Sequence, residues 1–214
     1  SLVLLQAQQK LNEAAAVMSP RYTTVNPAAN AGLVEGMKGL FNPTDTIAKQ
    51  FKNGMMGTGV LGFDEINMSQ SIKQHTTGNF PVSPIVSSSA TFVEGQSTLA
   101  ITFTSGTKTV KQGDVFTIAG VYAVNPQTRE STGSLQQFVV TADNSVTSGT
   151  SMTLAISPAL YTSANALATV DSFPAQSAVI TFLGSASTQY PQNMIYHKDA
   201  ITFATADLLL PQGV

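Results

Sequence analysis

Only eight charged side chains occur between residues 78 and 189. Over the same stretch, short runs of Val, Ile, Thr and Phe alternate with clusters of Gly, Ser, Asn and Pro. Because the first group favours strands and the second favours turns, the pattern predicts an all-β domain. We expect about six strands, at 91–93, 98–103, 115–124, 135–142, 152–156 and 179–183, with a turn at 111–114 and a loop at 125–130 between them. Six short antiparallel strands are typical of a small barrel or sandwich.

The residues before this stretch combine helical and strand patterns. Apolar residues recur at helical spacing over 2–18 and predict an amphipathic helix that ends at the Ser-Pro pair 19–20. Residues 21–25 are expected to form a strand. The Asn-Pro pair at 26–27 supplies a helix cap and a first-turn proline, so a helix is expected over 27–37.

A second Asn-Pro pair at 42–43 predicts a short helix that ends at Asn53-Gly54. Alternating apolar residues then indicate a strand over 66–72. The final stretch, residues 193–210, alternates in the same way and predicts one or two further strands that return to the first domain.

Composition excludes several classes of function. The 214 residues contain 10 Lys and Arg against 12 Asp and Glu, too little positive charge to hold nucleic acid in general. Cysteine is absent, which excludes disulfides, thiolate metal sites and a cysteine nucleophile. No apolar run approaches the roughly 20 residues of a membrane helix, and the apolar start lacks the basic region of a signal peptide. Because the first residue is Ser, we expect the sequence to be a piece of a longer protein.

Two motifs resemble cofactor or acid–base sites. Residues 57–62 fit the dinucleotide pattern G-x-G-x-x-G, but the pattern requires a strand before it and a helix after it. Here a helix is expected before and a strand after, so a flexible loop is the preferred interpretation. Asp64 and Glu65 are neighbours on an expected strand, point to opposite faces and cannot converge on one proton or metal.

The two histidines also lack a catalytic context. His197 stands near Asp199, but no G-x-S-x-G nucleophile motif occurs in the chain. We interpret His197 as a surface or interface residue, and His75 likewise. No catalytic, cofactor or metal site is therefore predicted, and the chain is expected to be structural or interactive.

Three segments resemble one protein family. Residues 196–211 read YHKDAITFATADLLLP, residues 111–121 read KQGDVFTIAGV and continue in LQQFVV at 135–140, and residues 59–66 read GVLGFDEI. Together they are similar, in the same order, to the major capsid (coat) proteins of tailed bacteriophages. The similarity is to the short-tailed branch, whose coat proteins carry an inserted β-barrel domain.

This resemblance implies an α+β fold of the Hong Kong 97 capsid type. Residues 1–80 would form the first part of the axial domain, residues 81–189 an inserted antiparallel six-stranded β-barrel, and residues 190–214 the return to the axial and peripheral region. The N-terminal arm, extended loop and spine helix of such coat proteins have no counterpart here. That difference also indicates a fragment of a coat protein.

The implied function is that of a structural subunit of an icosahedral phage or prophage capsid. It would self-assemble into pentameric and hexameric capsomers that enclose DNA, with a scaffolding protein and a portal as partners. It would need no cofactor, specific nucleic-acid site or membrane, and it would be assembled in the bacterial host cytoplasm and reside in the virion. Candidate capsomer contacts are Leu40, Phe41, Met55, Met56, Arg129 and Glu130.

Two alternatives remain open from the residues alone. A β-rich adhesion or carbohydrate-binding module would suit the Thr- and Ser-rich strands. Sugar sites usually use aromatic rings, however, and the chain has no Trp and only 7% aromatic residues. A nucleotide-using enzyme would rest on the glycine loop at 57–62 alone.

Overall fold

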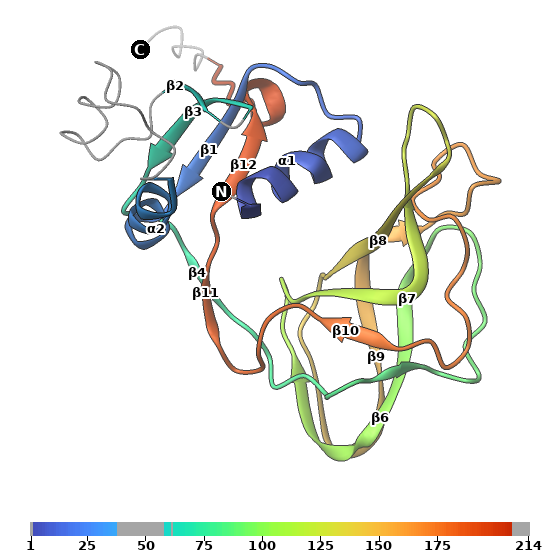
Figure 1. Cartoon of the computed structure of the whole chain (residues 1–214). Helices are drawn as coiled ribbons and strands as arrows, with labels where there is room; N and C mark the ends of the chain where they lie inside the picture. Colours follow the sequence, from blue (N-terminus) through green and yellow to red (C-terminus); the bar gives the residue numbers. More distant parts are fainter. Residues whose placement is uncertain (1, 38–57, 61, 207–214) are drawn as a thin grey trace, which may run out of the picture. The chain divides into compact units, whose positions relative to one another are not determined.

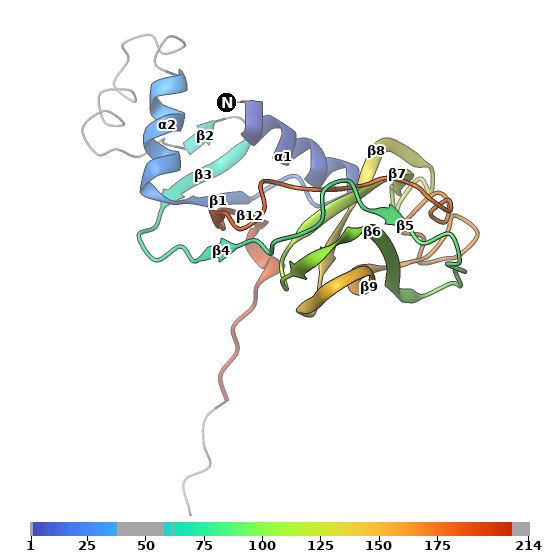
Figure 2. The ribbon, with the colours of Figure 1, turned by 90° about the horizontal axis from the view of Figure 1, so that it is seen from below.

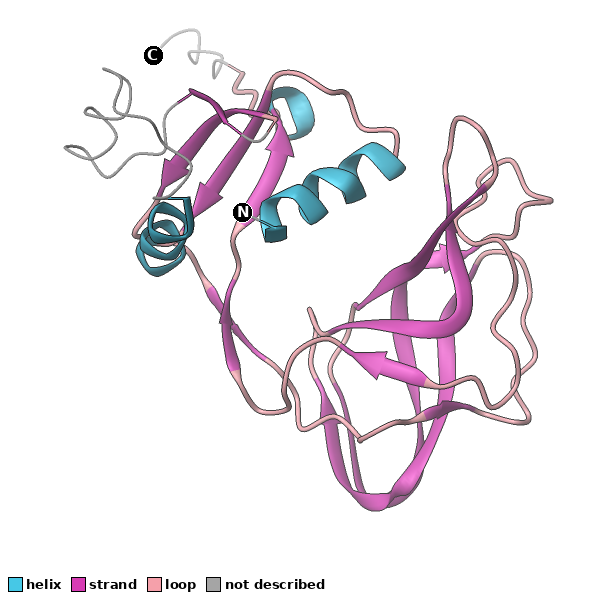
Figure 3. Cartoon of the chain, viewed as in Figure 1, coloured by secondary structure: helices cyan, strands magenta, loops and turns pink. Residues whose placement is uncertain are grey.

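The structure is a computed structural model that describes residues 2–37, 58–60 and 62–206 (Figure 1). Contacts divide the chain into two compact units. The first unit comprises residues 1–5, 17–70 and 193–214, and the second comprises residues 6–16 and 71–192. The described part of the second unit is mostly strand, whereas that of the first unit combines short strands with helices (Figure 3).

The described helices and strands follow one another in this order: α1 Leu2–Glu13, β1 Arg21–Val25, α2 Pro27–Met37, β2 Thr58–Val60, β3 Phe63–Met68, β4 Gln74–Thr76, β5 Ile85–Val86, β6 Gln96–Val110, β7 Val115–Val124, β8 Ser131–Val140, β9 Asn144–Leu160, β10 Ile180–Phe182, β11 Gln189–Pro191, β12 Met194–His197 and the 3₁₀ turn η1 Lys198–Ala200. No helix in the described ranges is long and apolar enough to cross a membrane.

The first unit contains a four-stranded sheet in the order β12-β1-β3-β2. Strand β1 pairs antiparallel with β12 and parallel with β3, while β2 and β3 form an antiparallel hairpin. The buried core of the described part of this unit consists of Leu4, Val25, Phe63 and Ile66. Segments from both ends of the chain therefore meet in one small sheet.

Two sequence predictions in this unit are confirmed, because their signals are local. Strand β1 and helix α2 have the expected bounds, 21–25 and 27–37. The amide of Ala29 donates to Asn26 Oδ1 at 3.1 Å, as expected for an asparagine at a helix N-cap. Figure 2 shows α2 as a separate helix beside β3.

The expectation that α1 continues to Met18 is wrong. The helix ends at Glu13, and two backbone hydrogen bonds form its C-terminal cap. Ala15 has a φ of 55°, its amide donates to Asn12 O, and the amide of Ala16 donates to Leu11 O. This is the Schellman arrangement, which usually has glycine where this chain has Ala15, so no residue type marked the helix end.

The second unit contains a six-stranded antiparallel sheet in the order β10-β7-β8-β9-β6-β5. Backbone hydrogen bonds also connect the segments that contain its two outer strands, β5 and β10. The amide of Val86 donates to Ala178 O at 2.9 Å, and the amide of Ile180 donates to Pro84 O at 2.8 Å. The sheet thereby curls into a nearly closed barrel (Figures 1 and 3). The predicted six-stranded antiparallel barrel is confirmed.

Aromatic rings fill the barrel. Phe182 stacks on Phe80, with ring centroids 4.6 Å apart, and contacts Phe116 at 5.5 Å, which in turn stacks on Phe138 at 5.7 Å. Phe116 and Phe138 are fully buried. Such rings bury large apolar areas and gain additional energy from stacked contacts, so they anchor this domain.

Strand β7 has the predicted bounds of 115–124, but the expected strand at 91–93 is wrong. The sixth strand is the two-residue β5 instead. Phe92 lies in a loop and stacks on Phe173 at 6.1 Å, so its ring is used for packing outside any strand. Strands β6 and β9 are longer than expected because they pair with each other through the polar Thr- and Ser-rich residues on either side of the predicted cores.

Strands β4 and β11 form a separate two-stranded antiparallel sheet, here called the ribbon. No pattern in the sequence predicted this ribbon. His75 and Tyr190 lie directly opposite each other in its register. Figure 2 shows β4 continuing into the chain that leads to β5.

Candidate assembly surface and ribbon junction

The loop between β7 and β8 presents the predicted contact residues Arg129 and Glu130 to solvent. Asn125 organises the loop, because its Oδ1 accepts hydrogen bonds from the amides of Gln127 at 2.8 Å and Thr128 at 3.2 Å. The backbone carbonyl of Asn125 also accepts a hydrogen bond from the Arg129 amide, and the Asn125 amide donates one to Glu130 O. An ordered loop thus holds one positive and one negative side chain on the barrel surface.

The other predicted contact residues, Leu40, Phe41, Met55 and Met56, lie outside the described residues.

The described residues of the glycine motif, 58–60 and 62, lie in a β-hairpin. Residues 58–60 form β2, which pairs with β3, and Gly62 has a φ of 78° in the turn between them. The prediction of a loop is therefore wrong for residues 58–60. Strand β3 follows directly, where a dinucleotide site would require a helix.

Asp64 binds the first residue of β1 and lies near Ser19 before it. One carboxylate oxygen accepts a hydrogen bond from the backbone amide of Arg21 at 2.7 Å. Both carboxylate oxygens of Asp64 lie near the hydroxyl of Ser19. Arg21 is itself buried, and its Nε donates to Val17 O at 2.8 Å. Asp64 is therefore held in a structural contact. The described residues contain no group of three or more potential metal ligands.

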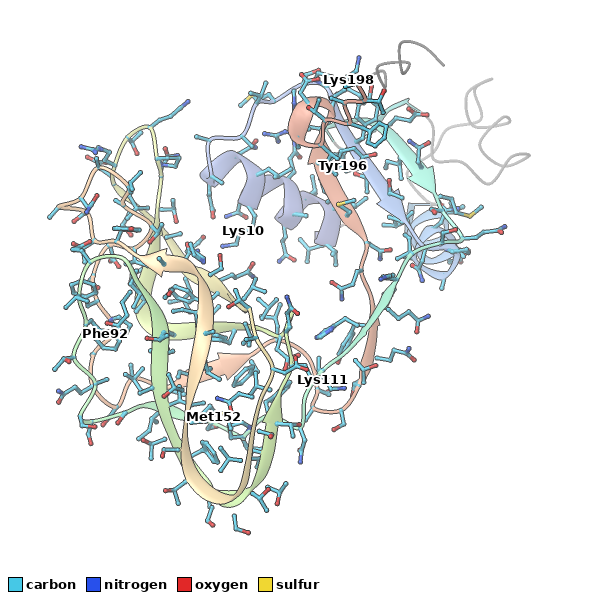
Figure 4. The ribbon with its side chains drawn as sticks, turned by 180° about the vertical axis from the view of Figure 1, so that it is seen from behind. Lys10, Phe92, Lys111, Met152, Tyr196 and Lys198 are labelled. Carbon is cyan, nitrogen blue, oxygen red and sulfur yellow. The ribbon has the colours of Figure 1, made fainter. Side chains whose placement is uncertain are left out.

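His197 caps the turn η1. Its Nδ1 accepts the amide of Asp199 at 3.2 Å, and its Nε2 lies 3.4 Å from Ser19 O. Lys198 donates its amide to Pro20 O at 3.1 Å. The His-Lys-Asp motif thus joins the end of β12 to the segment before β1, and Figure 4 marks this place by Tyr196 and Lys198.

His75 has a specific partner that sequence reasoning missed. Its Nε2 lies 2.9 Å from Asp114 Oδ1, and Asp114 is only 1% exposed. The same carboxylate accepts the amides of Lys111 at 2.8 Å and Gly78 at 3.1 Å. Three donors compensate the burial of this carboxylate, as a buried charged group requires. The turn 111–114 was recognised in the sequence, but its partner lies 39 residues away.

Tyr190, opposite His75 in the ribbon, is also fixed. Its hydroxyl accepts the amide of Ser185 at 2.8 Å. This backbone hydrogen bond lowers the pKa of Tyr190 below its ordinary value of 10.0. Both side chains line a cleft of about 300 Å³, together with Thr77, Asp114, Leu183 and other residues.

One further polar contact within the second unit involves Glu13. Its Oε1 accepts hydrogen bonds from Gln9 Nε2 at 2.6 Å and from Ser134 Oγ at 3.1 Å, and Lys10 Nζ lies 3.5 Å from Oε2. Burial raises the pKa of Glu13, but these hydrogen bonds and Lys10 outweigh it. The pKa of Glu13 is therefore held below its ordinary value of 4.5.

Comparison with known families supplies the identity of the chain. The family model described as "P22 coat protein - gene protein 5" matches residues 5–213. The chain belongs to the P22 coat protein family. A solved structure described as the CUS-3 coat protein I-domain is 30% identical to it, covers 54% of this chain and 98% of that chain, and gives a TM-score of 0.30. No curated protein matches the chain.

As a member of the P22 coat protein family, the chain is a structural subunit of a phage capsid and belongs in the virion. The predicted resemblance to short-tailed phage coat proteins is confirmed. The match favours the capsid subunit over an adhesion or carbohydrate-binding module. The family is a structural one, in which subunits assemble with one another into the capsid.

Proposed function

We propose that this coat protein forms pentameric and hexameric capsomers of an icosahedral shell around DNA. Residues 1–80 and 190–214 would supply the Hong Kong 97-type axial region, and residues 81–189 the inserted barrel domain. A scaffolding protein and a portal would be its assembly partners in the host cytoplasm. The observation that carries the proposal is the family match over residues 5–213.

The physical properties of the chain support repeated self-contact. Shells are built from heterologous contacts that close into rings, and many weak contacts together give a stable assembly. The formal net charge of −2 keeps electrostatic repulsion between copies small. The barrel adds an ordered loop with two exposed, oppositely charged side chains.

The assembly proposal is tested by electron microscopy of the whole gene product, co-expressed with its neighbouring reading frames so that a scaffolding protein is supplied. Uniform closed shells with fivefold and sixfold rings are the expected result. A protein that remains monomeric with those frames present would contradict the proposed capsomers.

The axial contacts are tested in the same expression system. Asp at Leu40 or Phe41, or at Met55 or Met56, is expected to abolish shells while the subunit stays folded, because a charge would be buried at each repeated contact. Normal shells from all four variants would exclude these residues as capsomer contacts.

The barrel contact predicts a smaller effect. Arg129→Glu or Glu130→Arg is expected to reduce shell yield several-fold, since each exposed ion pair contributes about 0.2–1 kcal/mol and recurs in every copy. Lys111→Glu, also at an exposed position of the second unit, serves as the matched control. Equal yields from the variants and the control, measured by sedimentation, would remove this loop from the proposed interface.

A further inference from the structure

The ribbon is too small to be stable by itself. Each of its strands has only three residues, Gln74–Thr76 and Gln189–Pro191. An isolated two-stranded ribbon is marginally stable at best in water. Its order must therefore come from side chains that tie it to a larger body.

His75 ties one strand of the ribbon to the turn before β7. Its ring is fixed by the hydrogen bond to the buried carboxylate of Asp114. The ring also lies close over Gly113, where an added Cβ would come within 3.3 Å of it. Gly113 has a φ of 98°, which favours glycine in this turn. The close contact with the His75 ring also favours glycine, because a side chain would crowd the ring.

Tyr190 ties the other strand to the turn after β10. Its hydroxyl receives the Ser185 amide, and its ring packs on Gly184, where an added Cβ would lie 2.9 Å from ring atoms. His75 and Tyr190 are direct partners in the ribbon register. The two strands are thus held at neighbouring points but to two different segments of the barrel.

Thr77 connects the ribbon to the barrel by hydrogen bonds. Its buried hydroxyl donates to Ser185 O at 2.7 Å and accepts the amide of Thr188 at 3.0 Å. Next to it, the amide of Gly78 donates to Asp114, and the amide of Ser187 donates to Gly78 O. Hydrogen bonds therefore run without a break from the ribbon into the barrel.

We propose that His75, Thr77, Asp114 and Tyr190 form a lock that makes the ribbon and the barrel one rigid body, with His75 as the positioning residue. This body spans residues 74–191 and so extends beyond the barrel domain proposed above. In a capsid subunit, the barrel then keeps a fixed orientation on the ribbon. Any change in its direction takes place in the chain outside residues 74–191.

Spin labels measure this directly, because the chain has no native cysteine to interfere. Cysteines replace Gln74 on β4 and Thr181 on β10, both exposed, and the distance distribution between the labels is recorded by electron resonance. A single narrow distribution is expected. His75→Ala should broaden it at least twofold, and should speed amide exchange in residues 74–78 about tenfold or more while leaving β7 and β8 protected.

Two further variants separate positioning from general damage. His75→Gln keeps an N–H donor at a similar reach and should restore the narrow distribution, whereas His197→Ala removes a histidine from the first unit and should leave it unchanged. If His75→Ala does not fold, Tyr190→Phe, which loses only the hydroxyl, replaces it and should give a smaller broadening. A broad distribution in the unaltered chain, an unchanged width in the folded variant, or failure of Gln to restore it would overturn the lock.

Discussion

The barrel and the sheet of the first unit bury very different amounts of apolar surface. In the described residues, the barrel cluster contains eighteen buried hydrophobic residues, whereas the first-unit cluster contains four. A core of the larger size can support a domain by itself. In the described part of the first unit, the core of four buried residues is accompanied by capping and turn contacts, such as the Asn26 cap of α2 and the bonds of Asp64.

The strongest test of this contrast is to damage the barrel core. Phe116→Ala should reduce the free energy of unfolding of the second unit by about 3–5 kcal/mol, because it removes a fully buried ring that contacts two others. Phe203→Ala, at a position 89% exposed, is the matched control and should change stability by less than about 0.5 kcal/mol. Denaturant unfolding followed by amide exchange assigns the loss to each unit. An equal loss of protection in β1 and β3 would show that the units do not fold independently.

A smaller change tests the dependence of the first unit on local capping. Asn26→Ala removes the cap of α2 and should destabilise the first unit by about 1 kcal/mol. Amide exchange should become faster in residues 27–37 and stay unchanged in the barrel. Asn26→Ser retains a capping oxygen and should recover most of the loss. If Ala and Ser behave alike in the exchange measurement, the side-chain cap contributes nothing to this helix.

The smallest expected effect concerns pH. The pKa of Glu13 is lowered in the folded chain, so its ionised form contributes stability above pH 4.5 that is lost as the pH falls through the folded value. Glu13→Gln should therefore lower stability slightly at pH 7 and flatten its decline in acid. Thermal unfolding from pH 7 to pH 3 measures both. A parallel decline in the two proteins would show that Glu13 contributes no pH dependence.

Sequence reasoning succeeded where the signal was local. The turn residues 111–114 and the loop 125–130 bracket β7, so its bounds were predicted correctly. The pair Asn26-Pro27 fixed the start of α2 in the same way. It failed at β5, whose two residues pair with β6 on one side and bond to residues 177 and 178 on the other. Nothing within a window around residue 85 encodes those partners.

The candidate sites show the same difference between local signals and distant partners. The loop that carries Arg129 and Glu130 could be found because Asn, Pro and Thr mark such loops in any sequence. The pairing of His75 with Asp114 could not be found in this way, and the sequence pattern only indicates that His75 is a surface or interface residue. His197 was assigned the same way, although its ring caps η1.

Composition and short-range pattern were enough to predict the β-rich middle of the chain and helix α2 and to exclude cysteine chemistry, because they need no knowledge of the fold. The family was inferred from the resemblance of three segments to known coat proteins, and the family match bears it out. The closure of the barrel through residues 84–86 and 177–180, and the ribbon with its lock, became visible only in the folded chain. Both depend on hydrogen bonds between residues far apart in the chain, and such partners are chosen when the chain packs.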